Sequence, residues 1–341
     1  MSLINLLRKQ NRKLLFTTPS HGQKFFIFNK FRNFYKKDIS ETDAHNPQEA
    51  LLKAQERAAK LYGTKYTYFL TNGSTSGIIA AVLTCTNKGD KVLIWRNAHP
   101  CHENAVKLAG CEPVYYNLPV NKDWGVPGRT LPEMIDIKDV KAVIVTSPTY
   151  EGIVSDIKNL KEICEKNNTY LIVDEAHGAL YPFSDKLPQS GVNIADFTIQ
   201  SLHKTAGGLN PTALLHVNCD LDPKNALSMF NTTSPSYPLL ATIEANINFL
   251  YSQKGIKKLN KLISSLEEIK NDVKNVEFGG DDITKLLIKK DGLSGYELSE
   301  ILFDKFDIED EKTNDISTML LCGIGTSDRK LEKLKHALLK L

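Results

Sequence analysis

Residues 169–179 read TYLIVDEAHGA, an apolar and β-branched run that ends in acids and a histidine. Leu171, Ile172 and Val173 are typical of a strand buried on both faces, because consecutive positions are all apolar. Asp174 follows directly, and a carboxylate at the end of a buried strand is costly unless it meets a cation. A helix N-cap or a structural ion pair would explain Asp174 equally well.

Six similar runs predict that this strand belongs to a sheet. They are YTYFL (66–70), KVLIW (91–95), EPVYYN (112–117), KAVIVTS (141–147), DFTIQS (196–201) and TALLHV (212–217). Helix-like stretches lie between most of them. Two examples are PQEALLKAQERAAKLYG, which ends at the cap candidate Gly63, and DIKNLKEICEKNN, which begins at the N-cap candidate Asp156. This alternation predicts an α/β fold with a mostly parallel seven-stranded sheet covered on both faces.

The pattern along the chain predicts three segments. Residues 1–45 form an N-terminal arm, residues 46–240 a large domain, and residues 241–341 a linking helix with a small α+β domain. The linking pattern is long and helical from Pro238 to about Lys270. It is followed by a strand candidate, ITKLLIKK, a helix, LSGYELSEILFDKF, a second strand, STMLLCGIG, and a terminal amphipathic helix.

The composition argues against several classes of partner. The 341 residues carry a net charge of only +3, so neither nucleic acid nor an anionic membrane is an expected partner. No apolar run approaches the roughly 20 residues that span a bilayer. The six cysteines form no CxxC pair, which indicates reduced thiols, and we expect no metal site. A cytoplasmic protein that binds a small metabolite is therefore expected.

The N-terminal arm has a charge bias of its own. Residues 1–37 are rich in lysine and arginine and contain no acid, as in peptides that direct import into organelles. The alternative is an arm whose apolar residues Leu3, Leu6 and Leu7 pack on the body or on a partner subunit.

Polar residues also follow other predicted strands. In parallel α/β sheets, ligands bind outside the carboxyl ends of the strands. The turn TNGSTSG (71–77) opens a helix, and its backbone N–H groups and three hydroxyls, those of Ser74, Thr75 and Ser76, suit a phosphate. A simple serine or threonine N-cap is an equal alternative. After the next strand, His99 could stack on a flat ring or could be an ordinary loop histidine.

The run IQSLHKTAGG (199–208) completes the set. It places Ser201, His203 and Lys204 directly after a strand. A lysine that forms an imine, an acid for a pyridinium nitrogen, a stacking imidazole and a phosphate cup together indicate pyridoxal 5′-phosphate (PLP). A nicotinamide cofactor is disfavoured, because no ribose-binding acid follows the NGSTSG turn at the expected spacing.

These motifs resemble the ornithine/lysine/arginine decarboxylase family of fold-type-I PLP enzymes. The resemblance runs from about Thr17 to Ala245. It passes through TPSHG, DISETDAHNP, FLTNGSTSG, RNAH, SPTYEG, VDEAHGA, SLHKT and TTSPSYPLL. It implies an aspartate aminotransferase-like large domain.

The resemblance implies a role for each candidate residue. Lys204 would be bonded covalently to PLP, Asp174 would hold the pyridine nitrogen, and His99 would stack on the ring. His177 would lie near the phenolic oxygen of the ring. The phosphate would be held by Ser74, Thr75, Ser201 and His203.

A further motif, TTSPSY (232–237), resembles the segment that such enzymes present near the active site of the partner subunit. It implies a homodimer with shared active sites, in which Thr232 and Thr233 reach the cofactor, although a plain helix-entry loop would have the same sequence. The chain also departs from the family pattern. TPSHG lacks the lysine that usually follows the histidine, and the segment at 43–47 is shortened. The chain ends soon after GIGTSD, so it resembles a short form without the long C-terminal domain.

We expect a basic amino acid (arginine, lysine or ornithine) to be decarboxylated to its amine and CO2. Aminotransfer, aldol cleavage and desulfuration remain alternatives, because a fold does not fix its chemistry. Transamination is disfavoured, because Arg329 is the only arginine after Arg129 that could hold an α-carboxylate. The altered TPSHG segment also leaves open a PLP-binding homologue without catalysis. A scaffold with no cofactor would require the order of Asp174 and Lys204 to be accidental.

Overall fold

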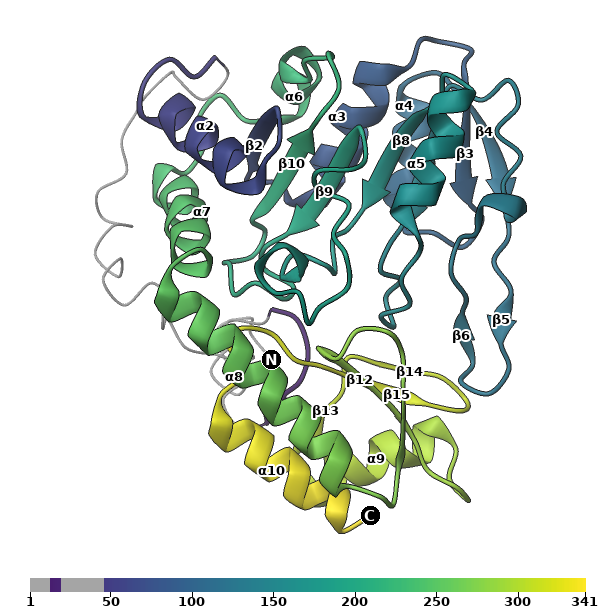
Figure 1. The fold of residues 1–341 in the computed structure, drawn as a ribbon, viewed down its shortest axis with the longest axis vertical. Helices are drawn as coiled ribbons and strands as arrows, with labels where there is room; N and C mark the ends of the chain where they lie inside the picture. Colours follow the sequence, from purple (N-terminus) through teal and green to yellow (C-terminus); the bar gives the residue numbers. More distant parts are fainter. Residues whose placement is uncertain (1–12, 20–45) are drawn as a thin grey trace, which may run out of the picture.

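The computed structural model describes residues 13–19 and 46–341. These residues form a large sheet covered by helices and, at the other end of the molecule, a smaller sheet with its own helices (Figure 1). The predicted contacts of Leu3, Leu6 and Leu7 lie outside the described residues.

The seven predicted strands all exist and form one sheet. Its spatial order is β2-β10-β9-β8-β7-β3-β4. Only β10 runs antiparallel to its two neighbours. The strands are β2 (Tyr66–Leu70), β3 (Lys91–Trp95), β4 (Glu112–Tyr116), β7 (Ala142–Thr146), β8 (Tyr170–Asp174), β9 (Phe197–Ser201) and β10 (Ala213–Val217). The prediction of a mostly parallel seven-stranded sheet is confirmed.

Helices cover both faces of this sheet, as the apolar runs require. In β8, Ile172 packs in the core beneath α3, whereas Leu171 and Val173 pack in the core on the other face with α5. Side chains alternate between the two faces of a strand, so an unbroken apolar run supplies both cores. The helices around the sheet are α2 (Ala50–Tyr62), α3 (Gly73–Cys85), α4 (Pro100–Leu108), α5 (Ile157–Lys166) and α6 (Lys224–Phe230).

Two helix boundaries follow directly from the sequence. Helix α2 ends at Gly63, whose φ of 71° is left-handed and therefore suits a glycine. Helix α5 begins at Asp156, whose carboxylate accepts a hydrogen bond from Asn159 N at 3.1 Å. Both predicted caps are confirmed.

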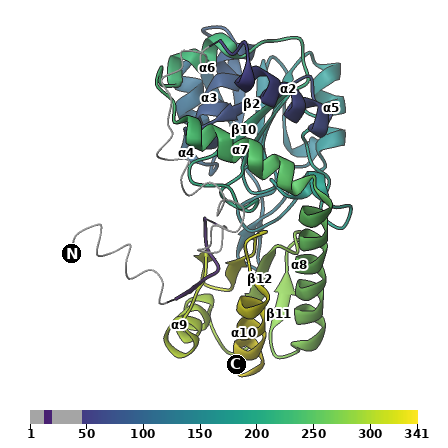
Figure 2. The same ribbon diagram turned by 90° about the vertical axis from the view of Figure 1, so that its left-hand side faces the viewer.

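The long helical segment leads from the large sheet to the small one. It consists of two helices, α7 (Tyr237–Leu250) and α8 (Gln253–Asp272), and Ser252 caps the start of the second. The small sheet has the order β11-β12-β15-β14, and α8 lies beside α10 next to it (Figure 2). Its strands and helices are β11 (Glu277–Gly279), β12 (Lys285–Lys289), β14 (Lys312–Thr313), β15 (Thr318–Leu321), α9 (Gly295–Phe306) and α10 (Asp328–Leu339).

The described part of the N-terminal arm packs on the small-sheet side. Strand β1 (Leu14–Leu15) pairs in parallel with β13 (Ile308–Glu309), and Phe16 is fully buried. The remaining short elements are β5 (Val120–Asn121), β6 (Val126–Pro127), η4 (Pro132–Met134) and η5 (Tyr181–Phe183).

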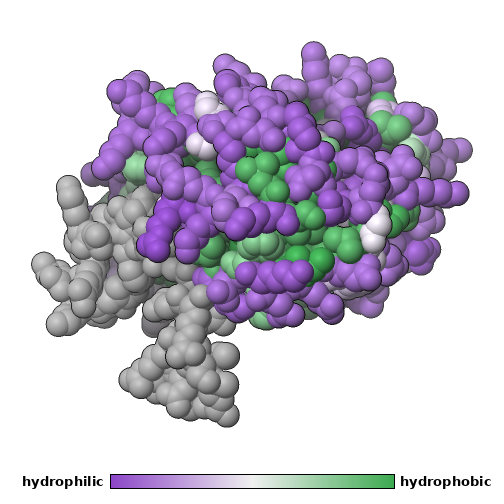
Figure 3. All heavy atoms as spheres, turned by 90° about the horizontal axis from the view of Figure 1, so that it is seen from below, coloured by the Kyte–Doolittle hydropathy of each residue, from purple (hydrophilic) through white to green (hydrophobic). Residues whose placement is uncertain are grey.

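The surface seen from the small-sheet end is largely hydrophilic, with hydrophobic groups gathered near its middle (Figure 3). Among the described residues, no helix is both long enough and apolar enough to cross a membrane.

Replacing Gly77 by alanine should destabilise the fold. A Cβ at this position in α3 would lie 2.8 Å from Leu70 Cδ1 and 3.0 Å from Ile199 Cγ2. Alanine normally stabilises a helix interior by about 1 kcal/mol relative to glycine. Here we expect the crowded Cβ to make alanine destabilising instead. The free energy of unfolding, measured in denaturant, should fall by about 1–3 kcal/mol.

Gly191→Ala is the matched control, because the nearest contact of its Cβ would be an ordinary 3.4 Å. Equal effects of the two substitutions would contradict this account of the packing of α3 on the sheet.

Candidate active site

A cavity of about 540 Å³ lies at the carboxyl ends of the large sheet's parallel strands, where ligands bind in this class of fold. It brings together seven residues that the sequence singled out. They are Ser74, Thr75, His99, Asp174, His177, His203 and Lys204. The start of α3, the end of β8 and the loops after β3, β8 and β9 supply these side chains, so residues far apart in the chain meet at one edge of the sheet.

The Lys204 amine lies against an imidazole. Lys204 Nζ is 2.9 Å from His177 Nε2, and His177 packs on the ring of Tyr150 with the centroids 4.4 Å apart. Burial lowers the pKa of Lys204, although Asp174 opposes this shift. Burial, followed by the charge of Lys204, lowers the pKa of His177 well below its ordinary value. A neutral His177 Nε2 therefore accepts a hydrogen bond from the lysine.

Asp174 is buried and receives hydrogen bonds from two directions. His102 Nε2 donates to Oδ2 at 2.8 Å, and Ala176 N donates to Oδ1 at 3.1 Å. Burial alone would raise the pKa of Asp174, but the hydrogen bond and electrostatic influence of His102, together with the charge of Lys204, outweigh burial and lower it. Asp174 is thus held as a carboxylate facing Lys204.

His102 was not predicted from the sequence. It is fully buried on α4, three residues after His99, and its Nδ1 has no hydrogen-bond partner among the described residues. The spacing HPCH was the available signal, because residues three apart lie on one face of a helix.

Three residues beside Asp174 form a compact polar cluster. In the described part of the chain, ligand atoms of Cys101, His102 and Asp174 lie within 4.8 Å of one another. Within this cluster His102 Nε2 is bonded to Asp174, and burial raises the pKa of the Cys101 thiol to about 12.

His99 is held by the helix that it begins. It is the N-cap of α4, and its Nδ1 accepts a hydrogen bond from Cys101 N at 3.2 Å. This bond leaves the ring beside the cavity. Burial lowers the pKa of His99, as it does that of His203, whose Nδ1 lies 3.0 Å from Thr212 O. The cavity is therefore lined by imidazoles that favour the neutral form.

The start of α3 offers main-chain donors to the cavity. Asn72 is its N-cap residue but makes no side-chain capping bond, so the predicted alternative of a serine or threonine cap is wrong. Gly73, Ser74 and Thr75 line the cavity. Ser76 does not, because its hydroxyl is turned back to donate to Gly73 O at 2.9 Å.

Ser201 lies at the end of β9, fully buried, and is not among the residues that line the cavity. Its Oγ has no hydrogen-bond partner among the described residues.

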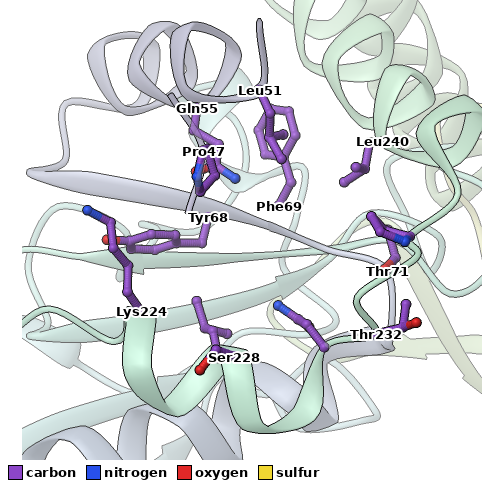
Figure 4. Close-up of a pocket in the computed structure, with 13 residues that line it drawn as sticks. Pro47, Leu51, Gln55, Tyr68, Phe69, Thr71, Lys224, Ser228, Thr232 and Leu240 are labelled. Atoms are coloured by element: carbon purple, nitrogen blue, oxygen red, sulfur yellow. The ribbon is translucent and has the colours of Figure 1, made fainter. Parts of the chain in front are cut away.

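Thr232 and Thr233 do not reach the Lys204 cavity of their own chain. Thr232 lines a separate, smaller cavity of about 40 Å³ between α2, β2, α6 and α7 (Figure 4). Its Oγ1 accepts a hydrogen bond from Ser234 N at 3.1 Å. That Thr232 and Thr233 lie in the active site of a partner subunit stays a prediction.

The wall of the Lys204 cavity also contains Tyr150 and Glu151, from the SPTYEG motif, and Lys312, to which the sequence analysis gave no role. Lys312 Nζ comes from β14 and lies 2.5 Å from Glu151 Oε1. Glu151 is buried, and its Oε2 has no hydrogen-bond partner among the described residues. The small sheet therefore contributes charge to the site, which the strand pattern alone could not reveal.

Comparison with known proteins assigns the family. The family model described as Orn/Lys/Arg decarboxylase, major domain, matches residues 7–286. The chain belongs to the Orn/Lys/Arg decarboxylase family. The predicted resemblance is thus confirmed.

Individual proteins that are similar to this chain support its assignment to the family. It is 29% identical to an arginine decarboxylase of Bacillus subtilis (strain 168), over 96% of this chain and 74% of the relative. The structure of the Escherichia coli constitutive lysine decarboxylase matches with a TM-score of 0.78 and 19% identity, over 92% of this chain and 55% of that one. The chain thus spans about half the length of that solved decarboxylase. At the level of the family, the predicted carboxy-lyase class is confirmed.

The aspartate aminotransferase of Thermotoga maritima matches in fold, with a TM-score of 0.65 and 16% identity over 99% of this chain and 94% of that one. The predicted fold-type-I large domain of this decarboxylase-family chain is confirmed.

Lys204 should react with an acetylating reagent at a lower pH than an ordinary lysine. Its lowered pKa leaves more of the amine neutral, and hence nucleophilic, at any pH below the ordinary value of 10.5. The pH dependence of acetylation, measured by mass spectrometry of the Lys204 peptide, should have its midpoint below that value. Asp174→Asn should lower the midpoint further, because Asp174 is the main group that raises this pKa. A midpoint that rises in Asp174→Asn would contradict the assignment.

Proposed function

We propose that the chain is a PLP-dependent decarboxylase that converts arginine, lysine or ornithine into the corresponding amine and CO2. One observation supports this most directly: Lys204 and Asp174 line a single cavity in a member of the Orn/Lys/Arg decarboxylase family. An amine for the aldehyde of PLP and a carboxylate for its ring nitrogen are the two groups that this cofactor needs from a protein.

The donors around the cavity fit the phosphate of PLP. The first turn of α3 presents backbone N–H groups beside the hydroxyls of Ser74 and Thr75, and a helix N-terminus favours an anion. The Ser201 Oγ also has no hydrogen-bond partner among the described residues, but it does not line the cavity, so its contact with the phosphate stays a prediction. We propose that these groups and His203 hold the phosphate, with Ser76 contributing only its main-chain N–H.

The remaining residues fit the ring. His99 would stack on one face, since its orientation is held by the bond to Cys101 N. Asp174 would hold a proton on the ring nitrogen, and His102 would orient Asp174 for this role. His177, beside Lys204, would face the phenolic oxygen.

When bound, PLP supplies an electron sink for the electrons that remain on Cα after CO2 departs. The residues of the chain provide the rest. The lowered pKa of Lys204 makes its amine available as a nucleophile. A charged Asp174 would hold a proton on the ring nitrogen, which would favour the electron sink. Because Lys204 Nζ and His177 Nε2 are 2.9 Å apart, the pair could hold the proton that returns to Cα.

A basic substrate fits the charges of the cavity wall. Glu151 Oε2 is buried without a hydrogen-bond partner among the described residues, and a buried polar atom of this kind is costly to leave unsatisfied. The guanidinium or ammonium group of a basic amino acid would pair with it. Lys312, which contacts Glu151 and lines the same cavity, would face the α-carboxylate.

The proposal extends to the assembly. We propose a homodimer in which Thr232 and Thr233 lie near the cofactor of the partner subunit. We also propose residues 46–240 as the PLP-binding domain, with residues 241–341 as the linking helix and small domain and residues 1–45 as an arm.

Product analysis tests the reaction. With PLP added, the protein should release CO2 and the matching amine from arginine, lysine or ornithine. Lys204→Ala should lower the rate by about 10³-fold or more, because it removes the amine that lies beside His177 and faces Asp174. Keto-acid formation without CO2 would favour aminotransfer. PLP binding without turnover of any common amino acid would favour the non-catalytic alternative.

His102→Asn should lower kcat/KM by about 10- to 150-fold, because a hydrogen bond to a charged group contributes about 1.5–3 kcal/mol. It should also lower the pH at which the ring nitrogen of bound PLP loses its proton, measured by NMR of ¹⁵N-labelled cofactor. His216→Asn is the matched control. His216 is also fully buried, on β10, but it bonds Thr67 and Gln200 and does not line the cavity. If the ring nitrogen loses its proton at the same pH in His102→Asn as in the wild type, the proposed role of His102 in orienting Asp174 is contradicted.

A further inference from the structure

A buried ion pair of the small sheet contacts the loop that carries His177. The side chains of Asp282 and Lys285 are both fully buried, with Lys285 Nζ 2.5 Å from Asp282 Oδ2. Lys285 is the first residue of β12, and Asp282 lies in the turn before it. None of the chemistry proposed above uses either residue.

Asp282 is fully hydrogen-bonded. Its Oδ1 accepts from Thr284 N at 2.8 Å and from Thr284 Oγ1 at 2.7 Å, and its Oδ2 also accepts from Tyr181 OH at 2.8 Å. Burial favours the protonated form, but Lys285 and these bonds outweigh it and lower the pKa of Asp282. Replacing a buried ion pair with apolar residues is often neutral or stabilising. Stability alone is therefore a weak reason for this pair.

Lys285 has a second acceptor on the large-domain side. Its Nζ donates to the main-chain oxygen of His177 at 3.0 Å. The side chain of the same His177 holds the Lys204 amine, with Nε2 2.9 Å from Nζ. Lys285 is thus connected to Lys204 through a single residue.

Two other contacts fix the same region. Ile324 N, which follows β15, donates to Thr205 O at 2.9 Å, directly after Lys204. The stem of Lys285 packs against Gly152, where a Cβ would lie 2.9 Å from Lys285 Cδ and where φ is +89°. The small-sheet side therefore holds the main chain at His177 and next to Lys204.

We infer that Lys285 is a positioning residue of the active site: by fixing the main chain of His177, it directs His177 Nε2 to hold the Lys204 amine in the cavity. The chemical role of Lys204 in this inference rests on the proposed function. The series of contacts from Asp282 through Lys285 and His177 to Lys204 is observed in the structure. The small sheet thereby sets the direction of the reactive amine.

The charge of Lys285 also influences the titration of both active-site groups. It is among the charges that, after burial, lower the pKa values of both His177 and Lys204. Removing it should raise both. The other groups that influence Lys204 are Asp174, Glu311 and Cys101, and those that influence His177 are Lys204, His203 and Lys312.

Three variants of the full chain test the inference. Lys285→Met removes the donor, Asp282→Asn/Lys285→Met removes both charges so that no carboxylate is left unpaired, and Lys289→Met is the matched control. Lys289 is on the same strand, where it pairs with Glu277 at 3.2 Å on the partly exposed side. Thermal unfolding establishes that each variant folds. Two readouts follow: the pH dependence of Lys204 acetylation without cofactor, and the rate of PLP attachment, detected by mass after borohydride reduction.

In Lys285→Met and in the double variant, we expect the acetylation midpoint of Lys204 to rise and PLP attachment to slow by about 10- to 100-fold, as expected for a misplaced reacting group. Lys289→Met should match the wild type in both readouts. If Lys285→Met does not fold, the double variant carries the test.

A folded double variant with the wild-type acetylation midpoint and attachment rate would overturn the inference. Failure of the proposed function would look different. The wild type itself would then take up no PLP, while the cofactor-free acetylation profile would still show whether Lys285 controls the amine.

Discussion

The site depends on one electrostatic constraint: a carboxylate buried at the carboxyl end of β8 must be compensated. Asp174 receives a hydrogen bond from His102 on α4 and another from the main chain at Ala176, and the charge of Lys204 faces it. An unpaired buried carboxylate would be neutralised or would destabilise the fold. Meeting this constraint brings α4, the loop after β8 and the loop after β9 to one point.

The sheet makes this convergence possible. Strands β7, β8 and β9 are parallel neighbours, so the residues that follow them leave from one edge. Small residues and hydroxyls at the start of α3 complete that edge with main-chain donors. The small sheet closes the arrangement from the other side, through Lys312 at Glu151 and Lys285 at His177. Geometry and charge therefore come from segments more than a hundred residues apart in the sequence.

The sequence predicted which segments form the strands of the large sheet better than it predicted the direction of each strand. All seven strands were predicted, because two-sided burial produces recognisable apolar runs. The antiparallel direction of β10 was not, since TALLHV has the same pattern as a parallel strand. Asp174 and Lys204 were predicted because each follows such a run.

His102 and Lys285 were missed for physical reasons. The HPCH spacing places His102 on the same helix face as His99 but does not show that this face is buried, and a lysine at the start of a short strand has no local signal of burial. Only tertiary packing turns them inward, toward Asp174 and toward the main chain of His177. Likewise, Ser76 carries the same hydroxyl as its neighbours, and only the turn of the helix directs it back to Gly73 O.

The most direct measurement of the central claim is a crystal structure of the protein grown with PLP. The account predicts continuous electron density between Lys204 Nζ and the cofactor, with the ring nitrogen within hydrogen-bonding distance of Asp174 and His102 still bound to that carboxylate. A cofactor seated elsewhere, or a ring nitrogen turned away from Asp174, would contradict it.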